Sequence, residues 1–294
     1  MARPHRFGST HTREKLDSLE KYLRAFSTAL KNQGFRLIFF DAFAGTGDVQ
    51  IGEDSTLLDG VDDYSPFIQG STQRALQLGT AFDEYVFVEQ QRAKVKELEA
   101  LKAAHTEIAD RISVRHSDAN AALLEFCAKT DWKKSRAVVF LDPYGNQVKW
   151  KTIEAIAKTE GIDLWYLFPA GLGVHRQIGR DAKVHESHET SLDELLGTKD
   201  WRGTFIEEQE AQDLFGSRTE RSKVATPESI TRFMIQRMRT IFRGGVLDGW
   251  LPLSSRSIHM YSLVFAWANP SEKAKLAGKL AAAVLRSKRR GRVK

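Results

Sequence analysis

The chain has 294 residues, enough for one large domain with a modest insertion, and 41% of them are hydrophobic and 28% charged, as in a protein with a buried core. No apolar run reaches the roughly 18–20 residues of a membrane span. The first ten residues also lack the apolar stretch of a signal peptide, so we expect no membrane partner. The single cysteine, Cys127, excludes disulfides within the chain and a cysteine-based zinc site. We therefore expect a reducing, cytoplasmic location.

The formal net charge of +6 is concentrated at the C-terminus. Six of the 44 basic residues fall in the last nine positions, which contain no acid, and the other 38 basic residues equal the 38 acidic ones. A basic tail is typical of nucleic-acid binding, because each cation placed on a phosphate releases counterions. A tail that only keeps the chain soluble is an almost equally good interpretation. The candidate DNA or RNA contacts are Arg286, Lys288, Arg289, Arg290 and Arg292.

Strands and helices alternate along the first half of the chain. Thr12 is placed to cap a first helix that ends near Gly34. Short runs that are apolar on both faces predict parallel strands at 37–40, 85–88, 112–115, 137–141 and 164–168. Helical spacing predicts helices at 92–104, 119–128 and 150–158 between them. This alternation favours an α/β fold with a doubly wound, mostly parallel sheet.

Two polar segments interrupt this alternation, an acidic loop insertion at 48–69 and an irregular excursion at 171–225. A helix then starts at Thr226-Pro227-Glu228, and a late strand at 261–267 is stopped by Asn269-Pro270. We accordingly divide the chain into an N-terminal helical segment (1–34), a Rossmann-like cofactor-binding core (35–170), an insertion with a helical region (171–245), the final strands and helix (246–285) and the basic tail (286–294).

A glycine pair follows the first predicted strand, in the sequence Asp41-Ala-Phe-Ala-Gly45-Thr-Gly47. Glycines at this position let backbone amides approach a ligand. A dinucleotide-binding loop has a third glycine three residues later, but that position is Gln50, which disfavours NAD. A plain strand-to-loop turn fits these glycines as well as a ligand site does.

Two acids end the next two strands. Glu89 follows an apolar strand, and its carboxylate can accept hydrogen bonds from both hydroxyls of a ribose. Taken alone, Glu89 reads better as a solvated strand-end acid. Asp118 follows the third strand and can bond an adenine amino group or cap the helix after it, and the pattern alone favours the cap.

The fourth strand ends in Asp142-Pro143-Tyr144-Gly145, which places an acid, a rigid proline and an aromatic ring at the carboxyl edge of the sheet. Open α/β folds bind their ligands at that edge. The proline carbonyl can accept a hydrogen bond, and Tyr144 can stack on a planar base. A simple turn is the competing interpretation, and the order of all four motifs favours function.

Together these motifs resemble the class I S-adenosylmethionine-dependent methyltransferases, in their branch that acts on nucleic acid. The chain most resembles the three-Cys-motif partner proteins, over residues 11–270. The matching segments are 15–23, 41–47, Gly70-Ser71, Glu89, Asp118, 141–145 and 261–270. The resemblance implies a methyltransferase-like Rossmann fold with S-adenosylmethionine as cofactor. It further implies cofactor contacts from Asp41, Phe43, Gly45, Gly47, Glu89 and Asp118, and catalytic roles for Asp142, Pro143 and Tyr144.

The match has one departure, because Tyr144 stands one place earlier than the aromatic residue of amino-methyltransferases and Gly145 takes the next place. The sequence thus predicts transfer to an exocyclic amine of a base, and leaves open a binding module that works with a companion protein of a mobile-element or defence operon. Methylation at carbon 5 of cytosine is disfavoured, since Cys127 precedes the fourth strand and reads as a core residue. His175, His185 and His188 match no metal-ligand spacing.

Overall fold

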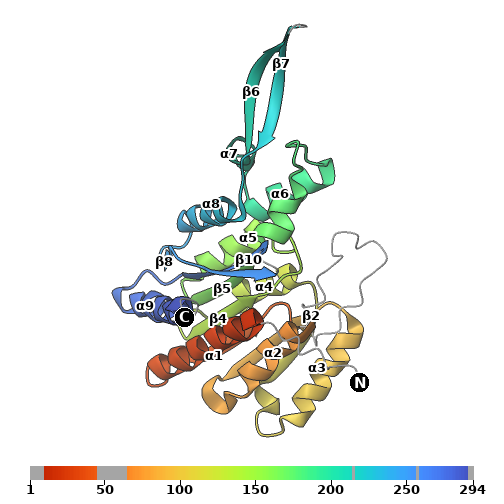
Figure 1. Cartoon of the computed structure of the whole chain (residues 1–294). Helices are drawn as coiled ribbons and strands as arrows, with labels where there is room; N and C mark the ends of the chain where they lie inside the picture. Colours follow the sequence, from red (N-terminus) through yellow and green to blue (C-terminus); the bar gives the residue numbers. More distant parts are fainter. Residues whose placement is uncertain (1–9, 45–64, 214–215, 256–257, 291–294) are drawn as a thin grey trace.

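The structure is a computed structural model that describes residues 10–44, 65–213, 216–255 and 258–290 (Figure 1). Its central sheet has eight strands, of which seven run in the order β3-β2-β1-β4-β5-β10-β8, while β9 pairs with β10. The strands are β1 (Arg36–Asp41), β2 (Glu84–Glu89), β3 (Ile112–His116), β4 (Ser135–Leu141), β5 (Ile162–Phe168), β8 (Gly245–Val246), β9 (Leu251–Ser255) and β10 (Ile258–Trp267). The first five are parallel, and β10 is antiparallel to β5, β8 and β9.

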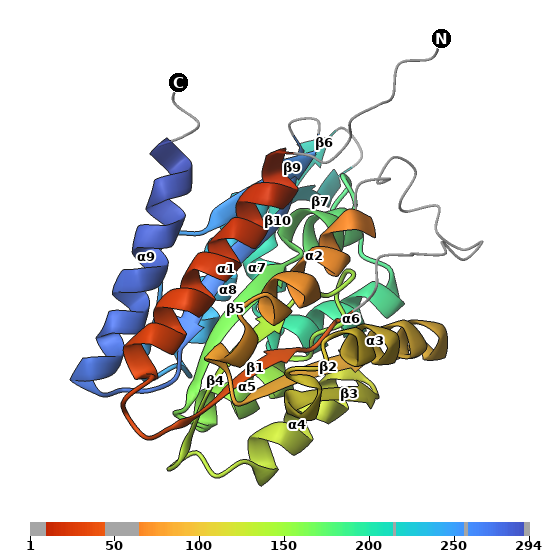
Figure 2. The same cartoon turned by 90° about the horizontal axis from the view of Figure 1, so that it is seen from below.

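Helices cover both faces of this sheet. One face carries α4 (Ala119–Lys129), α5 (Trp150–Lys158), α6 (Glu186–Leu196), α7 (Trp201–Phe205) and α8 (Pro227–Arg239). The other carries α1 (Thr10–Leu30), α2 (Ser65–Leu76), α3 (Arg92–Ala104) and α9 (Lys275–Arg290), with α1 and α9 side by side (Figure 2). Strand residues alternate between the two layers, as in β1, where Ile38 and Phe40 face the first and Leu37 and Phe39 the second. The predicted doubly wound, Rossmann-like α/β fold is thus confirmed.

The sequence located the regular elements closely. All six predicted strands form, and α3 and α5 have the predicted bounds. The predicted start of α8 is also confirmed, since Thr226 and Ser229 form a capping box with Pro227 in the first turn. Thr12 is not a cap, because α1 already begins at Thr10. Gly34 has φ +72°, the left-handed conformation that suits the turn after that helix.

The segment 171–225 is more ordered than predicted. It contains most of a π-helix, η3 (Ala170–His175), together with α6, α7 and a two-stranded hairpin, β6 (Ile206–Asp213) with β7 (Gly216–Lys223). The hairpin stands out from the body of the molecule (Figure 1). Its base is anchored where the Lys223 ammonium donates to the carbonyls of His175 and Ile178, at 2.7 and 2.9 Å.

Two predicted boundaries shift. Helix α2 begins at Ser65, so residues 65–69 of the predicted acidic loop are helical, and residues 48–64 lie outside the described part. Helix α9 continues to Arg290, so the predicted tail is helical over its first five residues. Across the described ranges no helix combines the length and the apolar character that crossing a membrane requires. The division of the chain into five segments stays a prediction.

Candidate functional site

Three carboxylates gather at the carboxyl edge of the sheet. Asp41 ends β1, Glu89 ends β2, and Asp142 directly follows β4. The strands β2, β1 and β4 are neighbours, and Asp41 is in register with Phe87 on one side and Phe140 on the other. Glu89 and Asp142 each lie two residues beyond those partners. Because side chains alternate along a strand, all three carboxylates project on the same face. This is also the point where the strand order reverses, the usual ligand position in such sheets.

Asp41 is fully buried. Its carboxylate accepts hydrogen bonds from the Phe43 amide (3.1 Å) and the Ser71 hydroxyl (2.9 Å). Burial raises the pKa of Asp41 to about 7, the two hydrogen bonds oppose this rise, and the negative charges of Asp142 and Glu89 add to it. Acidic groups thus gather at this site, and a cation bound there would favour the ionised form of Asp41. Ser71 was part of the sequence match, but its bond to Asp41 joins residues 30 positions apart and had no local signal.

The loop after β1 lies across the strand edge. The Ala42 amide donates to the Phe140 carbonyl (3.1 Å) of β4, and the Ala44 amide donates to the Val88 carbonyl (2.9 Å) of β2. Phe43, between them, is partly buried against the core on the α4 side. These contacts fix the path of residues 42–44 across the edge of the sheet. Gly45 and Gly47 themselves lie outside the described residues, so their predicted approach to a ligand stays a prediction.

Glu89 and Asp118 stand at the ends of β2 and β3. Glu89 is partly exposed, and its Oε1 accepts a hydrogen bond from the Gln91 amide at 2.6 Å. Asp118 is exposed, and its Oδ1 accepts from the Ala121 amide at 3.0 Å, which caps α4. The capping interpretation of Asp118 is thus confirmed. The contact of Asp118 with adenine stays a prediction, and so does the contact of Glu89 with ribose.

The loop after β4 separates its acid from its aromatic ring. Asp142 is only 2% exposed, whereas Tyr144 is 37% exposed and its amide donates to Gln147 Oε1 at 2.8 Å. Gly145 has φ +70°, so the chain turns immediately after Tyr144. Asn146 then donates to Gln177 Oε1 (2.8 Å), which ties this loop to the segment following η3. The loop thus carries a buried carboxylate and, two residues later, a partly exposed aromatic ring.

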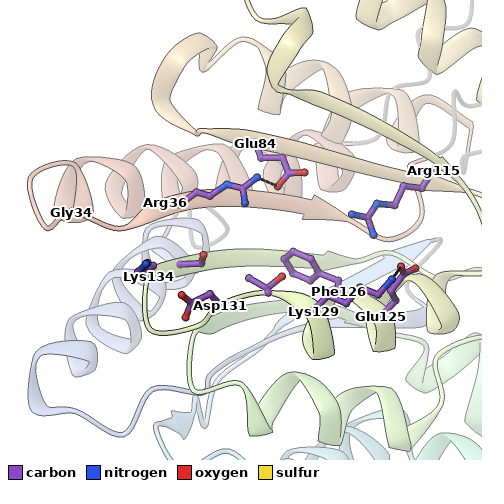
Figure 3. A pocket seen from close by; sticks show the side chains of 11 residues that line it. Gly34, Arg36, Glu84, Arg115, Glu125, Phe126, Lys129, Asp131 and Lys134 are labelled. Atoms are coloured by element: carbon purple, nitrogen blue, oxygen red, sulfur yellow. Dashed lines mark hydrogen bonds and ion pairs between the residues drawn. The ribbon is translucent and has the colours of Figure 1, made fainter.

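A groove of about 740 Å³ lies elsewhere, mainly at the amino ends of the strands (Figure 3). Arg36, Glu84 and Ser135, the first residues of β1, β2 and β4, line it together with the last turn of α4. Its charges neutralise each other in part, because Arg36 pairs with Glu84 at 2.8 Å and Lys129 with Glu125 at 2.6 Å. Asp41 stands at the far end of β1 from Arg36, so this groove is separate from the carboxylate site.

Other predicted chemistry can also be placed. Cys127 is half-buried on α4, and burial raises the pKa of its thiol to about 12, which makes it a poor nucleophile. Within the described ranges, no three His, Cys, Asp or Glu side chains are grouped in a way that could hold a metal ion. Among the proposed nucleic-acid contacts Arg286 is exposed on α9, Arg292 lies outside the described residues, and the side chains of 288–290 are not described.

No protein-family model and no curated protein sequence matches this chain. Among solved structures, a protein from Legionella pneumophila is similar at 14% identity, with a TM-score of 0.39 over 80% of this chain and 93% of that one. Magnesium protoporphyrin IX methyltransferase from Synechocystis, solved with bound S-adenosylmethionine, is similar at 12% identity, with a TM-score of 0.30 over 73% and 80%. An uncharacterized protein from Burkholderia thailandensis is similar at 9% identity, with a TM-score of 0.39 over 89% and 80%.

Proposed function

We propose that this protein binds S-adenosylmethionine at the carboxyl ends of β1, β2 and β4 and transfers its methyl group. The observation that carries the proposal is the set of three carboxylates, Asp41, Glu89 and Asp142, on one face of the sheet at the point where its strand order reverses. S-adenosylmethionine brings a sulfonium and an ammonium group, whereas the pyrophosphate of NAD would meet like charge here.

The residues present fit this cofactor in a definite arrangement. Glu89 offers carboxylate oxygens for the ribose hydroxyls, and the exposed Asp118 stands at the next strand end for the adenine. Asp41 accepts hydrogen bonds from the Phe43 amide and the Ser71 hydroxyl, so it positions Phe43, and its ionised form adds negative charge toward the ammonium group. When bound, the cofactor supplies an electrophilic methyl group on sulfur.

We further propose that the methyl acceptor is an exocyclic amine of a DNA or RNA base, as the resemblance to the nucleic-acid branch of the class I methyltransferases implies. Tyr144 is exposed enough to stack on a base. In this proposal Asp142 and the Pro143 carbonyl orient the amine. The chain's own contribution is alignment of the amine with the methyl group, with no covalent step through a side chain.

Calorimetry tests the cofactor directly. We expect the wild type to bind S-adenosylmethionine, and Glu89→Ala to weaken binding by about tenfold to a hundredfold, because hydrogen bonds to a charged group contribute about 1.5–3 kcal/mol. Glu84→Ala is the matched control, since Glu84 begins the same strand whose last residue is Glu89. Equal binding by wild type and Glu89→Ala, or no binding by either, would refute the cofactor assignment.

The rival function is a non-catalytic nucleotide-binding partner of a companion protein, and the turn at Gly145 directly after Tyr144 favours it. Transfer of labelled methyl to DNA or RNA separates the two. The methyltransferase requires transfer that Asp142→Ala abolishes while cofactor binding persists. Cofactor binding without transfer to either nucleic acid supports the binding partner instead.

The basic end of the chain makes a separate prediction. Replacing Arg286, Lys288, Arg289 and Arg290 with glutamine, which preserves helix propensity in α9, should flatten the salt dependence of nucleic-acid binding. On duplex DNA, the slope of log K against log salt should fall by about 0.9 for each phosphate that the variant no longer neutralises. The control replaces four exposed lysines elsewhere, Lys96, Lys133, Lys151 and Lys158. Equal slopes in both variants would remove this segment from the interface.

A further inference from the structure

A buried chain of hydrogen bonds joins α8 to β10. His259 links Glu228 to the buried part of this chain. Its Nδ1 lies 2.9 Å from Glu228 Oε1, and its Nε2 lies 2.9 Å from the Ser262 hydroxyl. The Ser262 hydroxyl lies 2.7 Å from the Thr231 hydroxyl, which donates to the Pro227 carbonyl at 2.7 Å. Ser262 and Thr231 are fully buried and His259 is 9% exposed. Solvent water therefore has little access to the inner hydrogen bonds of this chain.

Counting hydrogens along this chain shows which protonation state would satisfy all four hydrogen bonds. Each of the four hydrogen bonds needs one hydrogen, and the Pro227 carbonyl can only accept, so Thr231 uses its hydrogen there. Ser262 must then donate to Thr231, and Nε2 of His259 must donate to Ser262. Nδ1 must also donate, because the Glu228 carboxylate only accepts. A neutral imidazole leaves one of the four positions without a hydrogen, whereas an imidazolium completes all of them.

The extra proton belongs to the histidine and not to the glutamate. The Glu228 side chain is about half exposed, at 51%, and its hydrogen bond with His259 lowers the pKa of its carboxyl group. Glu228 is thus a carboxylate at neutral pH, which can only accept from Nδ1 of His259. Among the described residues, the titratable neighbours of this pair include His175 of η3 and Lys223 of β7. Burial and the Lys223 charge lower the pKa of His175, and the Glu228 charge raises it.

We propose that His259, Ser262, Thr231 and Glu228 form a buried proton-binding site that holds α8 and the inserted hairpin against the sheet. The site sits where several elements meet. Ser262 pairs with Phe168 of β5, and the backbone of His259 packs against Gly171 of η3. Glu228 stands in the first turn of α8, five residues after Lys223 at the hairpin's base. Loss of the proton leaves one buried hydrogen-bonding position without its hydrogen. The packing of α8 against β10 therefore weakens as pH rises.

Two-bond ¹H–¹⁵N spectra of the histidine rings test this site, recorded from about pH 5 to about pH 9. We expect both ring nitrogens of His259 to carry a proton at pH 7 in the wild type. Thr231→Val keeps the shape of the side chain but removes two hydrogen bonds, so Ser262 can donate to a neutral ring. We expect proton binding by His259 to weaken about tenfold in Thr231→Val, although Thr231 does not touch the ring. Thr231→Ser keeps the hydroxyl and should behave as the wild type.

Three outcomes overturn the proposal. A singly protonated His259 ring in the wild type at pH 7 contradicts the hydrogen count. An unchanged titration in Thr231→Val, with a shift only in Glu228→Gln, reduces the cluster to a simple ion pair. Amide protection factors, corrected for the intrinsic rise of exchange with pH, that do not fall at the start of α8 and of β10 as His259 loses its proton contradict the proposed weakening of this contact. The site is independent of the cofactor proposal and survives its failure.

Discussion

Replacing Asp41 with asparagine is expected to make the unfolding free energy less dependent on pH. The folded-state pKa of Asp41 is raised from 3.8 to about 7. Between these values the folded protein holds a proton that the unfolded chain has lost, so stability falls as pH rises through this window. This rise in the pKa of Asp41 corresponds to a change of about 4 kcal/mol in the unfolding free energy. Asparagine stays neutral and can still accept from the Phe43 amide, so the variant should lack this loss.

The measurement is a set of denaturant titrations at several pH values, read as the difference between variant and wild type. The difference is needed because Asp163 contributes a slope of the same sign. Burial raises its pKa to about 7 as well, against the hydrogen bond from Tyr22 and the charge of Arg136, which lower it. The unfolding free energy of Asp41→Asn, relative to that of the wild type, should therefore increase as pH rises from about 4 to about 7. Asp181→Asn, at an exposed carboxylate, is the control and should show no such gain. A constant difference across that range would contradict the buried, protonated Asp41.

This linkage bears on the proposed function. A cation bound beside Asp41 favours its charged form, so cofactor binding should release a proton near neutral pH. The affinity for S-adenosylmethionine then rises as pH passes through about 7, and Asp41→Asn should remove that dependence. A carboxylate placed only to cap a loop has no such effect on the affinity.

The sequence was informative where the fold depends on local pattern. The strands could be located because each is apolar on both faces, as in Phe39 and Phe40 of β1, and a central parallel strand requires that. The cap by Asp118 and the capping box at Thr226 could be predicted because those bonds span three residues. The edge that gathers Asp41, Glu89 and Asp142 followed from strand order, since parallel neighbours end together.

The remaining features depend on contacts between distant residues. The hairpin of β6 and β7 had no apolar signal, because polar residues such as Glu207, Glu208 and Arg221 dominate it; its cross-strand ion pair between Arg221 and Glu208 (2.8 Å) joins residues 13 positions apart. The burial of Asp41 depends on Ser71 of α2, and the proton site on Glu228 and His259, 31 positions apart. The residue types can be recognised in the sequence, but these pairings between distant residues cannot.

Gly171→Ala is expected to be the most destabilising of the single changes considered. A Cβ at this position would run into the His259 carbonyl oxygen and lie 2.9 Å from the His259 carbonyl carbon and 3.0 Å from Met260 Cα. All three are backbone atoms, so no side-chain rotation relieves the overlap, and η3 must move away from β10. We expect the unfolding free energy to fall by about 3 kcal/mol, at the upper end of overpacking effects.

Gly203→Ala in α7 is the matched control, since nothing lies within 4 Å of its Cβ position and alanine favours a helix. It should be neutral or stabilise by up to about 1 kcal/mol. Equal stability of the two alanine variants would show that η3 can move away from β10 at little cost in free energy. If η3 instead keeps its position, the backbone of His259 must be displaced. Gly171→Ala should then also disturb the proton site, and its ring spectra should differ from wild type at a pH where both variants are folded.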